Sequence, residues 1–184
     1  ADVALVELPL HELLHRTTYV EGETDFNESF ATFVGYRGAI GFFAEHDGPG
    51  ADRTERARRA WSETLVRSRR WAEAVERLTD LYAEAAREQW PRAETLERRQ
   101  AIFAELGPPE RINNAVILAQ LAYQKELDRF ERAAERQGED LRETIRWVGE
   151  LSEASEDPFA ALAAALGEPA SASASEPAAE GGRR

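Results

Sequence analysis

The sequence predicts an all-α protein: a multi-helix bundle with a metal-binding helix hairpin near the N-terminus and long antiparallel helices. Three observations support this fold class. Apolar residues recur at spacings of three and four over most of the 184-residue chain, which is typical of amphipathic helices. Arg and Glu fill the positions between them, as on solvated helix faces. Breaks rich in Gly and Pro separate the runs.

The first helix is predicted over residues 2–19, and a turn over 20–25 follows it. Pro9 lies within this run and crowds the carbonyl four residues earlier. It therefore predicts either a kink or a helix that begins near Leu8. In both cases residues 11–19 are expected to stay helical.

The second helix is predicted over residues 26–46. Gly35, Gly38 and Gly41 recur in it every three residues, although each lowers helix propensity. A packing reason is therefore expected: a smooth stripe that another helix approaches closely. The loop before this helix is short, so a tight hairpin would bring Glu28, in its first turn, back toward the first helix.

Further helices are expected up to residue 166, and breaks at 47–51, 90–91, 107–109 and 138 separate them. Their predicted ranges are 52–88, 92–106, 110–137, 139–151 and 157–166. The run from Ile112 to Tyr123 is apolar all round and is predicted to be buried. We expect one helical domain over residues 1–167. Residues 168–184 have no large apolar side chain and are predicted to be a disordered tail.

Composition excludes several classes of protein. With 23 basic and 35 acidic residues the net charge is -12, which argues against nucleic acid as a partner. The chain has no cysteine, so imidazole and carboxylate must hold any metal. It contains no secretory signal and no apolar run long enough to span a bilayer.

The sequence HELLH at residues 11–15 is the strongest chemical signal. His11 and His15 lie four residues apart, so on a helix they share one face and are near enough to bind one metal ion. Glu12 points beside that pair, where a base acting on a metal-bound water must stand. Catalytic zinc usually takes three protein ligands. Glu28 is the candidate third ligand.

These motifs carry a resemblance. HELLHRTTYV, TDFNESFATFVG and RINNAVILAQLAY resemble the corresponding motifs of a bacterial family of predicted zinc aminopeptidases of the thermolysin-like (gluzincin) type. The resemblance covers most of residues 1–160. It implies that His11, His15 and Glu28 bind Zn²⁺ and that Glu12 is the general base. The pattern departs from thermolysin in the shorter interval between His15 and Glu28, and in Pro9.

The sequence therefore suggests a zinc-dependent metallopeptidase that acts on peptide substrates, and the resemblance alone makes it aminopeptidase-like. Tyr123 is the candidate catalytic donor to the oxyanion, by its position in the Asn-Asn helix and by the resemblance. An equally supported alternative is that Tyr123 is a half-buried tyrosine whose hydroxyl bonds to a neighbouring group of the protein. Tyr19 is a weaker candidate for the oxyanion donor. Asn27 and Asn114 are candidates for substrate binding, although capping or support of the site is their commoner role.

Several questions stay open at this stage. A free peptide amino terminus would need a carboxylate, for which Glu21, Glu23 and Asp25 are candidates. The alternative function is a non-catalytic all-α binding module with a structural or vestigial zinc site. The resemblance further implies a location in the bacterial cell envelope or periplasm. It also implies a longer N-terminus, which this helical metallopeptidase-like domain lacks and which is able to carry a lipid anchor.

Overall fold

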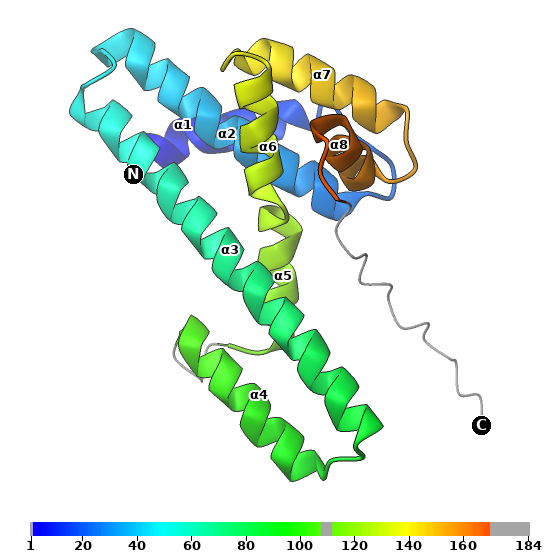
Figure 1. The fold of residues 1–184 in the computed structure, drawn as a ribbon. Helices are drawn as coiled ribbons and strands as arrows, with labels where there is room; N and C mark the ends of the chain where they lie inside the picture. Colours follow the sequence, from blue (N-terminus) through cyan, green and yellow to red (C-terminus); the bar gives the residue numbers. More distant parts are fainter. Residues whose placement is uncertain (1, 108–111, 170–184) are drawn as a thin grey trace.

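A computed structural model describes residues 2–107 and 112–169 of the chain. Within them it contains helices and no strand, so the predicted all-α multi-helix bundle is confirmed (Figure 1). The helices are α1 (Asp2–Leu14), α2 (Thr24–Asp47), α3 (Asp52–Arg87), α4 (Arg92–Leu106), α5 (Asn114–Gln124), α6 (Leu127–Arg136), α7 (Leu141–Glu153) and α8 (Pro158–Leu166). None of these described helices combines the length and the apolar composition that a bilayer-spanning segment requires.

The long helix α3 connects two parts of the molecule. Helices α1, α2, α6, α7 and α8 gather beside its N-terminal half, and α4 lies antiparallel to its C-terminal half (Figure 1). Apolar spacing and the terminating Gly and Pro residues predicted both α3 and α4 to within a residue or so. The predicted long antiparallel helices are thus present as α2, α3 and α4.

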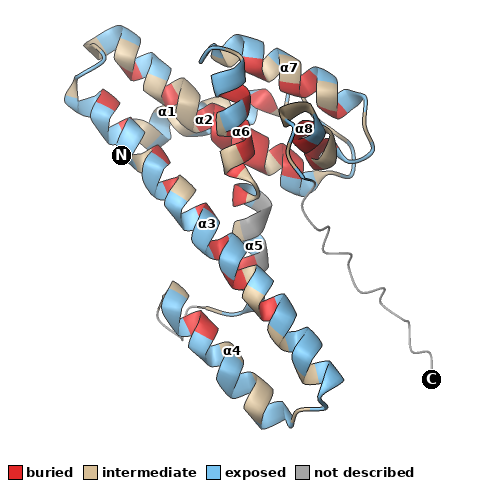
Figure 2. Cartoon of the chain, in the orientation of Figure 1, coloured by how far each residue is buried: buried red, intermediate tan, exposed pale blue. Residues whose placement is uncertain are grey.

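The main core is built around α2, which is buried along most of its first half (Figure 2). Phenylalanine rings dominate this core. Phe30 stacks on Phe130 of α6 with ring centroids 5.2 Å apart, and Phe26 meets Phe159 of α8 edge to face at the same distance. Such aromatic pairs add to the free energy gained by burying their area. The core therefore fixes the N-terminal end of α2, where Glu28 lies.

A second, smaller apolar cluster joins α3, α4 and α5. It contains Trp71, Ala74, Leu78, Ile102, Phe103 and Ile117. The apolar run at 112–123 was predicted to be buried throughout, and that prediction is wrong. Of the side chains that the structure describes in this run, Ile117 is buried, whereas Asn113, Asn114 and Tyr123 are exposed.

The first helix ends at Leu14, so the prediction that residues 11–19 are helical is wrong for its second half. The backbone N–H groups of Thr17 and Thr18 both donate to the Leu14 carbonyl at 2.8 Å, and the Thr17 hydroxyl donates to it as well at 3.0 Å. A threonine hydroxyl that competes for a helix carbonyl favours termination. Pro9 lies inside α1, so a start near Leu8 is also wrong.

The helix predicted over 110–137 is divided into α5 and α6. Glu126 separates them with φ +54°, a left-handed conformation that costs a non-glycine residue roughly 1–2 kcal/mol. Two serine hydroxyls offset this cost. Ser68 of α3 donates to the Gln124 carbonyl at 2.6 Å, and Ser29 of α2 accepts from the Lys125 N–H at 2.9 Å.

The end of the described chain is held against α6. The Glu168 carboxylate pairs with Arg129 and Arg132, and the Pro169 carbonyl accepts from Arg129 at 2.7 Å. The first two residues of the predicted disordered tail are therefore bound to the bundle. Residues 170–184 of that tail lie outside the described residues.

The buried side chain of Asn27 supports the loop between α1 and α2. Its amide accepts from the Val20 N–H at 2.9 Å and donates to the Val20 carbonyl at 2.7 Å. Asn27→Ala should therefore lower the free energy of unfolding by about 2–3 kcal/mol, because both Val20 groups lose their partner. We expect a fall of about 5–10 °C in Tm by calorimetry. The exposed Asn114→Ala serves as control, and an equal effect of the two substitutions would contradict this role.

Glu168 gives a pH-dependent contribution to stability. Its contacts with Arg132, and then Arg129, lower the pKa of its carboxyl. Because the folded pKa lies below the unfolded value of about 4.3, the contribution is complete above that value and is lost as the pH falls through the folded pKa. Urea unfolding should show Glu168→Gln less stable than wild type at pH 7, with the difference shrinking below about pH 4. A difference that is constant with pH, or equal to that of the exposed control Glu156→Gln, would refute the argument.

Candidate metal centre

The hairpin of α1 and α2 brings the end of one helix to the start of the next. Two glycines of α2 allow the helices to approach closely. A Cβ on Gly35 would lie 2.9 Å from the Glu7 carbonyl oxygen, and one on Gly38 would lie 2.6 Å from Leu10 Cδ1. The predicted glycine stripe is therefore used at two of its three positions, because Gly41 faces open space.

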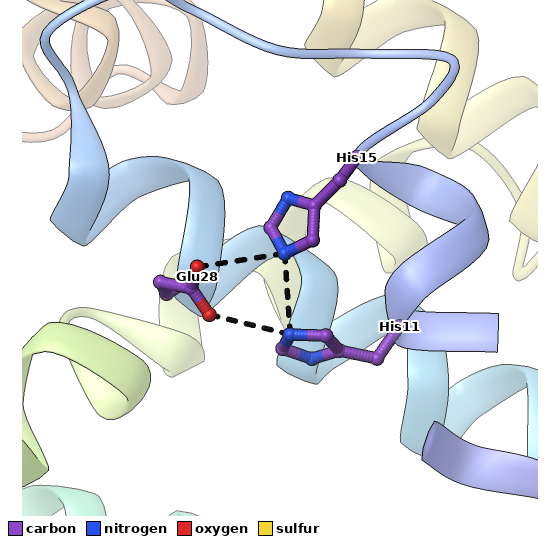
Figure 3. Close-up of side chains that lie close together, drawn as sticks. All are labelled: His11, His15 and Glu28. Atoms are coloured by element: carbon purple, nitrogen blue, oxygen red, sulfur yellow. Dashed lines mark hydrogen bonds and ion pairs between the residues drawn. The ribbon is translucent and has the colours of Figure 1, made fainter. Parts of the chain in front are cut away.

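Three side chains from this hairpin converge on one point (Figure 3). His11 Nε2 lies 3.2 Å from His15 Nε2 and 3.2 Å from Glu28 Oε2, and His15 Nε2 lies 3.5 Å from Glu28 Oε1. Zinc–nitrogen bonds of 2.0–2.1 Å at tetrahedral angles separate two ligand atoms by about 3.3–3.4 Å. The three distances are thus close to the edge length of a zinc tetrahedron, although the two that involve Glu28 end on different oxygens of its carboxylate.

The chemistry of this group also fits a cation. His11 is buried, and His15 and Glu28 are partly buried. Two imidazole nitrogens and a carboxylate that point at one place can each give a lone pair to a metal ion, which satisfies all three together. Among the residues that the structure describes, this is the one group of three or more His, Asp or Glu side chains arranged in this way.

The group opens into a cavity of about 410 Å³ between α1, α2, α3 and α5. The cavity is lined by Glu7, Leu8, His11, Glu12, His15, Glu28, Thr32, Tyr36, Thr64, Arg67, Tyr123 and Gln124. A space of this size accommodates a few residues of a peptide. The three converging side chains are therefore accessible from an open site.

Both predicted catalytic side chains line this cavity. Glu12 is exposed and follows His11 directly on α1. Tyr123 is 50% exposed, and its ring stacks on that of His11 with centroids 6.3 Å apart and an angle of 23° between the planes. Tyr123 stands next to the break between α5 and α6, so the unpredicted break helps to set its position.

The two predicted substrate-binding asparagines do not line the cavity. Both amide atoms of Asn27 are engaged by Val20, and Asn27 is only 3% exposed. The amide of Asn114 lies 3.3 Å from the Tyr82 hydroxyl, at the other end of α5 from Tyr123. Neither position supports contact with a substrate at the converging side chains, and their substrate role stays a prediction.

Four other candidates from the sequence, and the third histidine, do not line the cavity. Glu21, Glu23 and Asp25 do not line the cavity. His46 is at the far end of α2, where its Nδ1 lies 2.9 Å from the Phe42 carbonyl oxygen. Tyr19 meets His15 edge to face at 6.5 Å and does not line the cavity.

Glu7 and Gln124 are among the polar residues of the cavity wall that sequence reasoning missed. Glu7 is partly buried, and this burial raises the pKa of its carboxyl. Its spacing of four residues from His11 was a usable signal, because residues i and i+4 share a helix face. Gln124 is 9% exposed, and its Oε1 atom has no hydrogen-bond partner among the described residues. No local pattern marks Gln124, because tertiary packing brings it to the cavity.

Comparison with known proteins gives one match. The model of a family described as "Putative aminopeptidase" matches residues 1–161. The comparisons with curated proteins and with solved structures gave no match. The matched range includes the hairpin and every residue that lines the cavity. The chain therefore belongs to this putative aminopeptidase family.

Proposed function

We propose that the protein is a zinc-dependent metallopeptidase of the aminopeptidase type. The observation that carries this proposal is the convergence of His11, His15 and Glu28 at tetrahedral spacing on the wall of an open cavity. Family membership supports a peptidase activity in general terms. The zinc and the mechanism are inferred from the side chains.

His11, His15 and Glu28 would hold the ion through two nitrogens and one carboxylate oxygen. This ligand set is that of many catalytic zinc sites, which leave a fourth position to water or substrate. When bound, zinc supplies a water of lowered pKa and polarises the scissile carbonyl. A structural zinc site normally has four protein ligands, so the three ligands and the open cavity favour catalysis over the alternative of a binding module.

Glu12 is proposed as the general base and acid. It follows a ligand directly on the same helix, and it lines the cavity that would receive the peptide. A carboxylate oxygen there takes a proton from the attacking water and later gives it to the leaving amine. Glu12 is exposed, so its carboxylate is able to reach both the water and the leaving amine. No ion pair that would hold it elsewhere is found in the described part of the chain.

Tyr123 is proposed to stabilise the developing negative charge on the carbonyl oxygen. The stacking on His11 orients its ring beside the three proposed ligands. A phenol hydroxyl donates a hydrogen bond, and a donor aimed at the oxyanion stabilises the transition state. Within the described residues its hydroxyl has no recorded hydrogen-bond partner, so it is available to a substrate.

Metal binding gives the first test. We expect about one zinc per chain by mass spectrometry after dialysis, and a raised Tm in zinc-loaded protein because the ion binds the folded state. Glu28→Ala should weaken zinc binding at least about tenfold by removing one of three ligands. Glu21→Ala, an exposed carboxylate outside the cavity, should bind zinc as wild type does. Unchanged affinity in Glu28→Ala would refute the proposed ligand set.

The proposed role of Glu12 gives the second test. Glu12→Gln should keep the zinc content of wild type but lose about 100- to 10,000-fold in kcat for peptide hydrolysis, because the amide cannot transfer the proton. Release of amines from a peptide library measures this. The matched control is Glu45→Gln, which changes an exposed carboxylate on α2. The mechanism is wrong if Glu12→Gln keeps both its zinc and full activity.

A further inference from the structure

A second cavity adjoins the candidate metal centre along α3. It has a volume of about 340 Å³ and lies between α3 and the end of α4. Arg67 lines both this cavity and the one that holds the three proposed zinc ligands. The two cavities therefore adjoin at the Arg67 side chain, and the mechanism above uses only the first of them.

Two guanidinium groups on the wall of the second cavity have no carboxylate partner in the described part of the chain. Arg67 donates to the Thr64 hydroxyl at 2.9 Å, and Arg70 donates to the Glu105 carbonyl at 2.6 Å. Each guanidinium has five N–H donors, so most of them stay available to a ligand. By contrast, the neighbouring Arg69 is paired with Asp128.

The charge of this wall is opposite in sign to that of the whole chain. Among its described residues, Arg67 and Arg70 carry two positive charges and Glu63 carries one negative charge, which leaves a formal charge of +1. The chain as a whole carries -12. A local excess of positive charge in a hollow attracts anions, and a planar guanidinium matches the geometry of a carboxylate.

Apolar side chains complete this wall and suit the rest of a peptide chain. Val66 is 51% exposed there, beside Trp71 and Leu106. Leu106 and Arg70 also line a smaller hollow of about 70 Å³ further along α3. The hollows therefore continue past Arg70, which suits an acidic side chain within a longer peptide better than the carboxylate at a chain end.

We propose that Arg67 and Arg70 bind an acidic side chain of the substrate, about three residues beyond the bond that is cleaved. This inference rests on the proposed function and adds a preference for acidic peptides. Thr64 lines the cavity of the metal centre, and the stretch of α3 from Thr64 to Arg70 spans about 9 Å. An extended peptide covers this length in about three residues.

Binding of matched peptides tests this subsite without requiring catalysis. The probes are the amidated peptides Leu-Ala-Ala-Asp-Ala-Ala and Leu-Ala-Ala-Asn-Ala-Ala, each with its first peptide bond reduced to CH₂–NH so that it cannot be hydrolysed. By calorimetry, zinc-loaded wild type should bind the Asp peptide about tenfold more tightly than the Asn peptide, as expected for charged hydrogen bonds.

Substitutions of the two arginines should remove or reverse this preference. Arg67→Gln combined with Arg70→Gln should reduce it to about twofold or less, whereas Arg59→Gln, an exposed residue of α3 outside the cavities, should keep it. Arg67→Glu combined with Arg70→Glu should instead prefer Lys to Gln at the same peptide position, a gain that a misfolded variant cannot show. Circular dichroism checks that each variant is folded.

The outcomes separate this inference from the proposed function. If wild type binds the Asp and Asn peptides equally, or if the glutamine variant keeps the preference, the subsite is refuted even where the unreduced peptides are cleaved. If the preference depends on the arginines but no unreduced peptide is cleaved, the subsite stands and the proposed peptidase activity fails. If Leu-Ala-Ala-Ala gains more from a free carboxylate in place of its amide than the Asp peptide gains over Asn, the ligand is a chain end and the proposal is wrong.

Discussion

The close approach of α1 to α2 is the constraint on which the candidate site depends. His11 lies in the last turn of α1, His15 follows directly after that helix, and Glu28 belongs to the start of α2. The distances between their ligand atoms therefore depend on the separation of the two helices. Gly35 permits that separation, because a Cβ there would collide with the backbone carbonyl of Glu7, and a Cβ on Gly38 would require the Leu10 side chain to move. The glycines lower the helix propensity of α2, and the close approach that they allow brings the three side chains together.

A second constraint is the break between α5 and α6. A continuous helix would carry the chain straight on from Gln124, whereas the left-handed Glu126 redirects it after the two residues that line the cavity. Serine hydroxyls from α2 and α3 hold the two sides of this break. The strain of one residue is therefore offset by hydrogen bonds from the helices that also form the cavity wall. The same serine hydrogen bonds therefore stabilise the break in the fold and position the residues of the cavity wall.

Local patterns predicted the all-α class, most helix ranges, the two histidines and the glutamate between them, because each depends on spacing within one helix. Glu28 could be predicted as well, since the loop before it is short. What the sequence could not reveal depends on tertiary contacts. The division after Gln124 is held by serines far away in sequence, and the exposure of α5 reflects which neighbours it lacks. Asn27 was a candidate for substrate binding, with capping or support of the site as its commoner role, and the structure shows its amide engaged by Val20.

The charge on the cavity wall connects these features to the proposed chemistry. Glu7, Glu12 and Glu28 carry three negative charges there, and Arg67 carries one positive charge, which gives the described wall a formal charge of −2 when the histidines are neutral. One divalent cation neutralises this charge. The charge on the described cavity wall therefore favours the binding of a cation beside the histidines.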